Sequence, residues 1–193
     1  MYRAAILLLA AALSAGAASP EHSAAPERFE IGYDSAIVSE RGPITTCVLF
    51  HDSQVHKFVP PANMRLMVEG LQKKIVFTGT DLDTTVTIQL LDEKLAATSA
   101  AQLNRIRQQV RERYPQGRIV EEGECYTSDG KGCSFDVDYE VENIFRRARV
   151  CFVPIRDRSE TVMFTLATSA ATFTAGHLTF MTMVGSFETR PPK

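Results

Sequence analysis

The residues best suited to chemistry in this sequence are histidines and an acid that lie close together. His51, Asp52 and His56 form the closest group of possible metal ligands. Imidazole and carboxylate can bind a metal ion, but a metal site normally needs three or four donors placed around it. A five-residue spacing on a loop or strand end does not make the two histidines converge. We therefore interpret this group as a polar loop and expect no metal or other cofactor.

Thiol catalysis is a second possibility, because Cys47 or Cys151 could act as a nucleophile with a histidine as its base. An oxidising compartment would pair or consume such a thiol. His177 lies on the apolar face of a predicted helix, where histidine is more often a hydrogen-bonded boundary residue than a ligand. The sequence contains no G-x-S-x-G, phosphate-binding loop, dinucleotide-binding or H-E-x-x-H motif. We predict no catalytic residues; the alternative is a motif-free extracytoplasmic hydrolase with a site beside the segment 51–63.

The four cysteines, at positions 47, 125, 133 and 151, indicate two disulfide bonds in an exported protein of this size. Three pairings are possible. Cys125 and Cys133 bracket a turn signal at Asp129-Gly130, and a hairpin there would bring them opposite one another. Elimination then pairs Cys47 with Cys151. The alternatives are four reduced, buried thiols or a zinc site, which has less support because no CxxC or paired-histidine spacing accompanies the cysteines.

The N-terminus has the pattern of a secretory signal peptide. A short basic start that ends at Arg3 precedes the apolar run 4–13, which is too short to cross a bilayer, and small residues follow at 15–18. We predict a signal peptide over 1–18, a disordered lead-in over 19–28 and one globular domain over 29–188. The alternative is a retained membrane anchor. We expect an extracytoplasmic protein, periplasmic or secreted, without stable membrane insertion after cleavage.

The composition excludes some partners. Hydrophobic residues make up 45% of the chain and charged residues 23%, as in ordinary globular domains. A formal net charge of −2 gives no reason to expect nucleic acid or an anionic membrane as the partner. Arginines gather at 105–113 and 146–158, but acidic side chains lie among and near them, so we expect a balanced, solvated surface.

Hydrophobic periodicity predicts the elements that must position these residues. Alternating side chains predict strands at 29–38, 44–51, 74–78, 84–91, 118–124, 133–141, 145–153 and 161–167. One helix is expected after Ser99, which would cap it, and a second after Thr168 or Ser169. The apolar faces of these helices consist of Leu103, Ile106, Val110 and Tyr114 in the first, and Phe173, His177, Phe180, Met181, Val184 and Phe187 in the second. The segment 59–63 is predicted to be a loop, and 64–70 is ambiguous.

Two neighbouring strands carry charges of opposite sign at alternate positions. Asp136 and Asp138 lie on one strand, and Arg147 and Arg149 lie on the next. The simplest use of these arginines is to pair with the acids across the sheet, each pair contributing about 0.2–1 kcal/mol.

The element order strand, helix, three-stranded meander, helix resembles the Mog1/PsbP-like fold over about residues 74–187. The resemblance is carried by the helix after VTIQLLDE, the meander through CSFDVDYE, RRARVCFV and TVMFTLATS, and the closing helix that ends in Gly185-Ser186-Phe187. It implies an α+β fold, with an antiparallel sheet flanked by helices. Mog1-like and PsbP-like proteins act mainly by binding protein partners or supporting assemblies. The resemblance therefore implies a non-enzymatic accessory or binding module with a protein partner.

Overall fold

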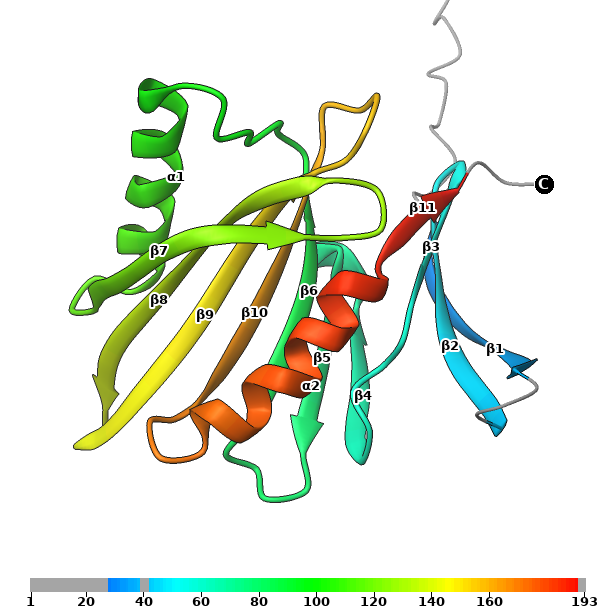
Figure 1. The fold of residues 1–193 in the computed structure, drawn as a ribbon, viewed down its shortest axis with the longest axis horizontal. Coiled ribbons are helices and arrows are strands. Elements are labelled where there is room, and N and C mark those ends of the chain that lie inside the picture. The colour runs from blue at the N-terminus through cyan, green and yellow to red at the C-terminus, as the bar shows by residue number, and fades with distance from the viewer. Residues whose placement is uncertain (1–27, 39–41, 191–193) are drawn as a thin grey trace, which may run out of the picture.

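The computed structural model describes residues 28–38 and 42–190, which form two antiparallel sheets and two α-helices (Figure 1). The small sheet contains β1 (Phe29–Val38), β2 (Gly42–His51), β3 (Gln54–Phe58) and β11 (Glu188–Arg190). The large sheet contains β4 (Met64–Glu69), β5 (Lys74–Gly79), β6 (Thr85–Leu91), β7 (Arg118–Tyr126), β8 (Lys131–Val141), β9 (Ile144–Pro154) and β10 (Thr161–Ser169). The helices are α1 (Ala100–Arg113) and α2 (Phe173–Ser186), and a 3-10 turn, η1 (Gly70–Gln72), follows β4.

The strand order is β1-β2-β3-β11 in the small sheet and β4-β5-β6-β10-β9-β8-β7 in the large one. The predicted α+β fold with an antiparallel sheet flanked by helices is confirmed. The predicted signal peptide and residues 19–27 of the predicted lead-in lie outside the described residues.

Helix α1 covers one face of the large sheet. Ser99 is its N-cap, and the Ser99 side chain accepts a hydrogen bond from the backbone N–H of Gln102 at 3.3 Å, as predicted. Ile106 and Val110 are buried against the strand residues Phe135 and Phe152. The helix starts and faces the sheet as its sequence pattern indicates, because the cap and the apolar stripe act together.

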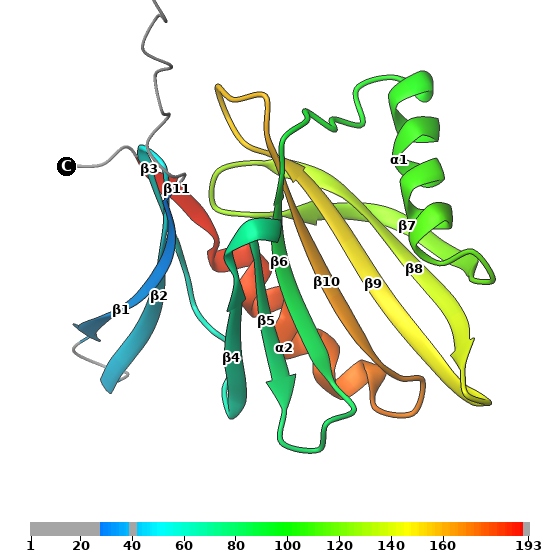
Figure 2. The same ribbon diagram turned by 180° about the vertical axis from the view of Figure 1, so that it is seen from behind.

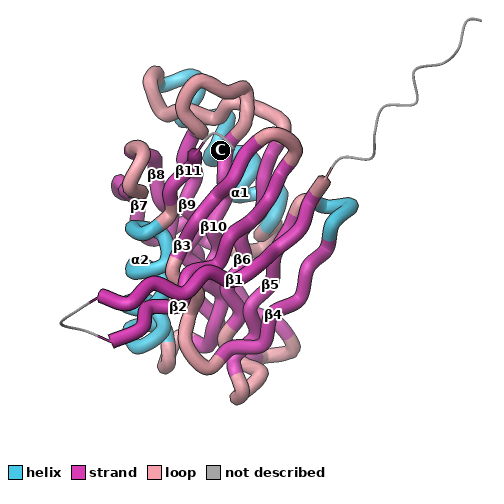
Figure 3. The backbone as a smooth tube through the Cα atoms, turned by 90° about the vertical axis from the view of Figure 1, so that its right-hand side faces the viewer, coloured by secondary structure: helices cyan, strands magenta, loops and turns pink. Residues whose placement is uncertain are grey.

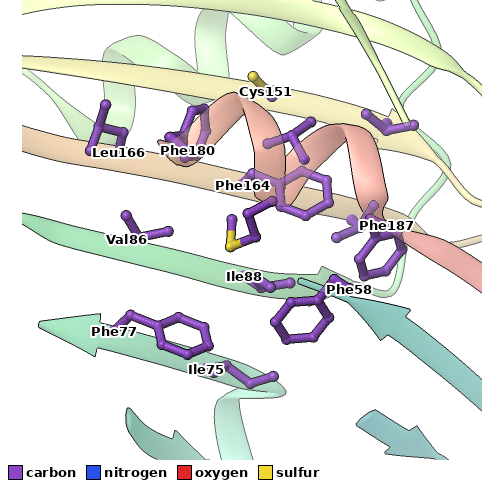
Figure 4. Close-up of a cluster of buried hydrophobic side chains, with 14 of the residues drawn as sticks. Phe58, Ile75, Phe77, Val86, Ile88, Cys151, Phe164, Leu166, Phe180 and Phe187 are labelled. Atoms are coloured by element: carbon purple, nitrogen blue, oxygen red, sulfur yellow. The ribbon is translucent and has the colours of Figure 1, made fainter. Parts of the chain in front are cut away.

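Helix α2 lies on the opposite face, so that the strands of the large sheet lie in front of it in the view from behind (Figure 2). Phe180 of α2 packs with Phe164 of β10 and with Phe187 in the main core (Figure 4), and Val184 belongs to the same cluster. The predicted cap at Thr168 or Ser169 is wrong, because both residues end β10 and the helix begins only at Phe173. The Thr168 hydroxyl and the Ser169 backbone N–H instead donate to the Asp83 carboxylate, each at 3.1 Å.

The small sheet shares this core. Cys47, Leu49 and Phe58 belong to the same buried cluster as Phe77 and the α2 side chains. The Phe58 ring lies 6.2 Å, centroid to centroid, from the rings of both Phe77 and Phe187. Figure 3 shows β1, β2 and β3 in front of the large sheet, and one face of the small sheet is therefore left on the outside of the molecule.

Candidate functional site

The predicted polar loop around His51 and His56 is instead a tight hairpin. His51 ends β2, Gln54 begins β3, and the two residues between them turn the chain, with Asp52 at a positive φ of 51°. His51 is 2% exposed and His56 is fully buried, and their rings are stacked with centroids 6.4 Å apart. The sequence pattern missed β3 because these histidines are core residues of a five-residue strand.

One of the two histidines, His51, lies near a carboxylate from the turn between β9 and β10. Glu160 places Oε1 at 3.6 Å from His51 Nδ1, and Asp52 places Oδ2 at 3.5 Å from His51 Nε2. His56 Nδ1 is hydrogen-bonded to the Thr189 hydroxyl at 3.1 Å. Within the described residues, His51 Nε2, His56 Nε2 and Glu160 Oε2 are buried without a hydrogen-bond partner. Burial, reinforced by His51 and by the charge of Arg158, lowers the pKa of His56 to about 4.

This histidine cluster does not have the geometry of a reaction centre. In the part of the chain that the structure describes, no group of three or more His, Cys, Asp or Glu side chains is placed to hold a metal ion. The Thr189 hydroxyl and His56 could form a nucleophile–base pair, but no carboxylate is hydrogen-bonded to the other ring nitrogen of His56. Both imidazoles are closed off from solvent, so we interpret the cluster as the junction that joins the β2–β3 hairpin, the β9–β10 turn and β11.

The predicted cross-strand charge pairs are confirmed. Asp136 lies opposite Arg149, and Asp138 lies opposite Arg147. Arg149 binds the Asp136 carboxylate through two hydrogen bonds of 2.5 and 2.8 Å, and Arg147 binds Asp138 through two of 2.6 and 3.0 Å. His177 of α2 is hydrogen-bonded to Arg149, and burial together with the Arg149 charge lowers the pKa of His177. His177 is therefore a hydrogen-bonded boundary residue, as predicted.

One expectation about this face needs correction. A solvated surface is expected around these arginines, yet Asp136 is only 3% exposed. The reason is that the charged face of β8 and β9 is the face on which α2 packs, and the Phe173 ring of α2 lies 5.5 and 6.0 Å from the guanidinium carbons of Arg147 and Arg149.

The structure describes all four cysteines as free, buried thiols, so the predicted disulfide bonds stay predictions. Their positions are informative. Cys47, Cys125 and Cys151 belong to the core under α2, whereas Cys133 belongs to the core under α1. Cys125 lies opposite Gly132 rather than opposite Cys133, and the two cysteines point to different faces of the sheet. The predicted Cys125–Cys133 pairing does not fit this placement, because a disulfide needs its two Cβ atoms close together.

The outer face of the small sheet carries a shallow groove that we call the outer groove. It has a volume of about 460 Å³. Residues from all four strands of the small sheet line it: Gly32, Tyr33, Asp34, Val48, Phe50, Val55, Lys57 and Arg190. Tyr33 lies opposite Cys47, so its side chain is on the other face of β1. Sequence reasoning assigned no role to these residues. The signal that could have found them is the continuous apolar run Cys-Val-Leu-Phe at 47–50, which gives β2 an apolar side chain on both faces.

The charges around the outer groove are already paired. Lys57 Nζ lies 2.9 Å from Asp34 Oδ2, and its hydrogen bond lowers the pKa of the Asp34 carboxyl. Arg190 lies 2.7 Å from Glu188. Arg28 pairs with Glu30 at 2.9 Å and lies over the Phe50 ring, 4.7 Å from its centroid. The groove therefore presents an apolar floor with a rim of neutralised charge.

A larger hollow of about 620 Å³ lies between α1 and β7, but it is polar. Arg107 and Glu122 in its wall form two hydrogen bonds of 2.8 and 2.6 Å with each other. Such a mutually satisfied pair offers little to a ligand, so we consider the outer groove the better candidate site.

The open strand edges differ in how they are protected. β7 carries the exposed acids Glu121, Glu122 and Glu124 and a register shift at the bulge after Ile119, and β4 is only six residues long. Charges, bulges and short length are the devices that prevent a strand edge from pairing with another chain. β1 is ten residues long, pairs only with β2 among the described residues, and has two charged side chains, Glu30 and Asp34. It is the least protected of these three edges.

Solved structures that are similar to this chain include the following three proteins. LpqN from Mycobacterium tuberculosis, involved in cell envelope biogenesis, is 11% identical, with 83% of this chain and 92% of LpqN covered and a TM-score of 0.53. The Ran-binding protein Mog1p of Saccharomyces cerevisiae is 10% identical, with 82% of this chain and 96% of Mog1p covered and a TM-score of 0.49. The cyanobacterial PsbP of Synechocystis is 13% identical, with 90% of this chain and 99% of that protein covered and a TM-score of 0.43.

No family model and no curated protein matches the sequence. Neither described helix combines the length and the apolar character that crossing a membrane requires. The structural matches concern the fold alone, and the Mog1/PsbP-like fold predicted from the sequence is confirmed.

Proposed function

We propose that this protein is an exported, non-enzymatic binding module that docks an extended segment of a partner protein along β1. The segment adds a strand to the small sheet and places an apolar side chain in the outer groove. The observation that carries the proposal is the juxtaposition of these two features: Gly32, Tyr33 and Asp34 of β1, the least protected of the three edges, also line the groove.

The chemistry of the surface favours a protein segment over a charged small molecule. An open strand edge offers a row of backbone N–H and C=O groups, which an extended peptide satisfies, while pockets beside the edge select alternate side chains. The Lys57–Asp34 pair at the rim would have to be broken before either charge could bind an ion of its own. Val48, Phe50 and Val55 form a floor that suits an aliphatic or aromatic side chain.

Two observations support an extracytoplasmic location. The first 18 residues have the basic start, short apolar run and small-residue exit of a signal peptide. LpqN, which shares the fold, is involved in cell envelope biogenesis. A shared fold is a weak argument for a shared function, so the location has its own test in the Discussion.

Site-specific photocrosslinking tests the docking surface. Tyr33, which is 61% exposed, is replaced by a photoreactive phenylalanine derivative in protein expressed with its own N-terminus. Tyr126 on the β7 edge, 55% exposed, is the matched control position. We expect a discrete adduct at position 33 and none at 126, with the crosslinked partner peptide mapping to an extended segment that contains an apolar side chain.

A groove-filling variant makes the test specific. Gly32→Leu places its Cβ no closer than 3.8 Å to Phe50, an ordinary contact, so the variant is expected to fold while it fills the groove. Gly70→Leu, at a position with open space around it, is the control. The adduct should disappear in Gly32→Leu and persist in Gly70→Leu. An adduct that Gly32→Leu leaves unchanged, an equal adduct at position 126, or none at 33 would overturn the proposed docking surface.

A further inference from the structure

Two of the four cysteines lie on the same side of the large sheet, one strand apart. Cys125 of β7 and Cys151 of β9 are both fully buried in the core under α2 (Figure 4 shows Cys151). β8 runs between them, and in its register Cys125 lies opposite Gly132 while Cys151 lies opposite Ser134. Both cysteines therefore project over the same short stretch of β8.

That stretch of β8 places no large side chain beside either cysteine. Gly132 has no side chain, and a Cβ added there would lie 2.0 Å from the backbone oxygen of Phe152. Ser134 is small, and its neighbour across the β7–β8 pair is Gly123. Side chains on alternate strands are normally kept apart by the strand between them. Here the intervening strand presents only a glycine and a serine, and Cα atoms of β7 and β9 come within 8 Å of one another. The Cys125 thiol is also the leading cause that raises the pKa of the Cys151 thiol, ahead of burial.

The other two cysteines lack this arrangement. Cys133 lies on the α1 side of the sheet, so its side chain projects away from the face that holds Cys125 and Cys151. Burial and, after it, the Cys125 thiol raise the pKa of Cys133. Cys47 lies on β2 of the small sheet, and burial raises its pKa to about 11, without a contribution from another thiol. Cys125 also donates a hydrogen bond to the Cys133 backbone oxygen at 3.4 Å, which holds its side chain on the α2 face.

We propose that Cys125 and Cys151 form a disulfide bond that ties β7 to β9 across β8, and that Cys47 and Cys133 remain thiols. The inference rests on the export part of the proposed function, because disulfides persist in oxidising compartments. This single bond takes the place of the predicted Cys125–Cys133 and Cys47–Cys151 pairs. Its two cysteines lie on the same face of the large sheet.

The bond has to form while the chain folds, because both thiols are closed off from solvent in the folded protein. A thiolate of one cysteine attacks a donor disulfide, either oxidised glutathione or the active-site disulfide of an oxidoreductase, and releases one reduced donor thiol. The second cysteine then attacks the mixed disulfide and releases the other. Two electrons and the two thiol protons thereby pass to the donor. Once α2 covers the bond, reductants have no access to it.

Refolding of the purified, reduced chain in a buffer of reduced and oxidised glutathione tests the pairing without depending on export. We expect the loss of the mass of two hydrogen atoms, and a non-reduced peptide map that links the peptides of Cys125 and Cys151. The variant with Cys47→Ser and Cys133→Ser should keep both signatures, and its melting temperature should fall by roughly 5–10 °C when the same protein is refolded under reducing conditions. Cys125→Ser should lose the linked peptide.

Several results would overturn the proposal. A dominant Cys125–Cys133 or Cys47–Cys151 peptide would refute the pairing, and four free thiols after refolding with oxidised glutathione would refute the bond itself. If the bond forms during refolding but is missing from protein isolated with its own N-terminus, the pairing stands and the proposed export fails. A melting temperature that is the same for the oxidised and reduced double variant would show that the bond does not brace the fold.

Discussion

At the scale of single residues, the main consequence of the structure is that several polar side chains are buried where the sequence suggested solvent. His56 is the clearest case, because burial lowers its pKa from 6.5 to about 4. The unfolded chain takes up a proton at this residue near pH 6.5, whereas the folded chain takes it up only near pH 4. Between these values the unfolded state binds more protons, so stability falls as the pH falls.

We therefore predict a pH-dependent loss of stability that depends on His56. The stabilisation lost between about pH 6.5 and pH 4 should approach roughly 3 kcal/mol, since one pKa unit corresponds to about 1.36 kcal/mol. Urea unfolding across this range should show a shallower pH slope for His56→Gln than for the original chain. Carboxylates common to both proteins contribute equally and cancel in the difference. Parallel slopes would contradict the assignment and would point to another histidine, His177, whose pKa is also lowered.

The buried ion pair gives a second prediction at this scale. Asp136→Asn leaves the Arg149 guanidinium, whose side chain is only 16% exposed, without its hydrogen-bonded carboxylate and with only the exposed Glu121 at 3.9 Å. Removing one member of a buried pair costs about 3–5 kcal/mol. Asp138→Asn is the matched control on the same strand, and it should cost about 1 kcal/mol or less because its partner Arg147 is 35% exposed. Urea unfolding measures both losses, and equal losses would show that the burial of Asp136 does not determine the strength of the pair.

At the scale of elements, the sequence was most informative where one strong local signal acts alone. The limits of β1 were predicted as observed, and so was the Ser99 cap of α1, because alternation and capping are local effects. β3 and β11 could not be predicted in this way. They have five and three residues, and their pairing depends on contacts between His56 and Thr189, which lie far apart in the chain.

A short proline-containing segment of the sequence also marks the boundary between the two sheets. Val59-Pro60-Pro61 follows β3, and prolines cannot donate to a strand ladder, so the chain leaves the small sheet at Phe58. The Val59 backbone N–H then donates to the Ser186 hydroxyl at 2.9 Å, which ties this connection to the end of α2. The predicted loop at 59–63 was therefore correct. The outer groove was not predicted, because its lining comes from four strands, and the pairing of β11 with β3 was not predicted.

Gly132 provides the prediction for this scale. A Cβ at this position meets the Phe152 backbone oxygen at 2.0 Å, and backbone cannot move aside as a flexible side chain can. Gly132→Ala should therefore destabilise the fold by about 3 kcal/mol or more, at the upper end of overpacking effects. Gly130→Ala, two residues earlier and with nothing within 4 Å, should cost less than about 1 kcal/mol. Thermal and urea unfolding give the ranking. A Gly132→Ala protein as stable as Gly130→Ala would show that the backbones of β8 and β9 do not approach so closely at Gly132.

At the scale of the whole molecule, the two sheets have different roles. The large sheet and its helices form the two cores, and the small sheet buries its inner face in one of these cores while its outer face stays open. The turn between β7 and β8 holds the two parts together at the end of α2, where the Ser128 hydroxyl donates to the Gly185 backbone oxygen at 3.0 Å and Asp129 accepts a hydrogen bond from the Thr189 backbone. A rigid frame of this kind fixes the groove and the β1 edge relative to each other, which suits strand addition better than a mobile loop would.

The remaining prediction concerns where this molecule works, since both the docking proposal and the Cys125–Cys151 bond presuppose an extracytoplasmic protein. The apolar run 4–13 is followed by small residues that suit signal peptidase, so the mature chain should begin near Ala18 or Ser19. Intact-mass measurement on protein recovered from outside the cytoplasm should show the loss of the preceding residues. Leu8→Arg, which interrupts the apolar run, should keep the full-length chain inside the cell, whereas Glu21→Arg, beyond the cleavage site, should not. A chain that retains Met1 in the membrane fraction would refute cleavage. It would make the protein a membrane-anchored module, in which the β1 edge could still dock a partner.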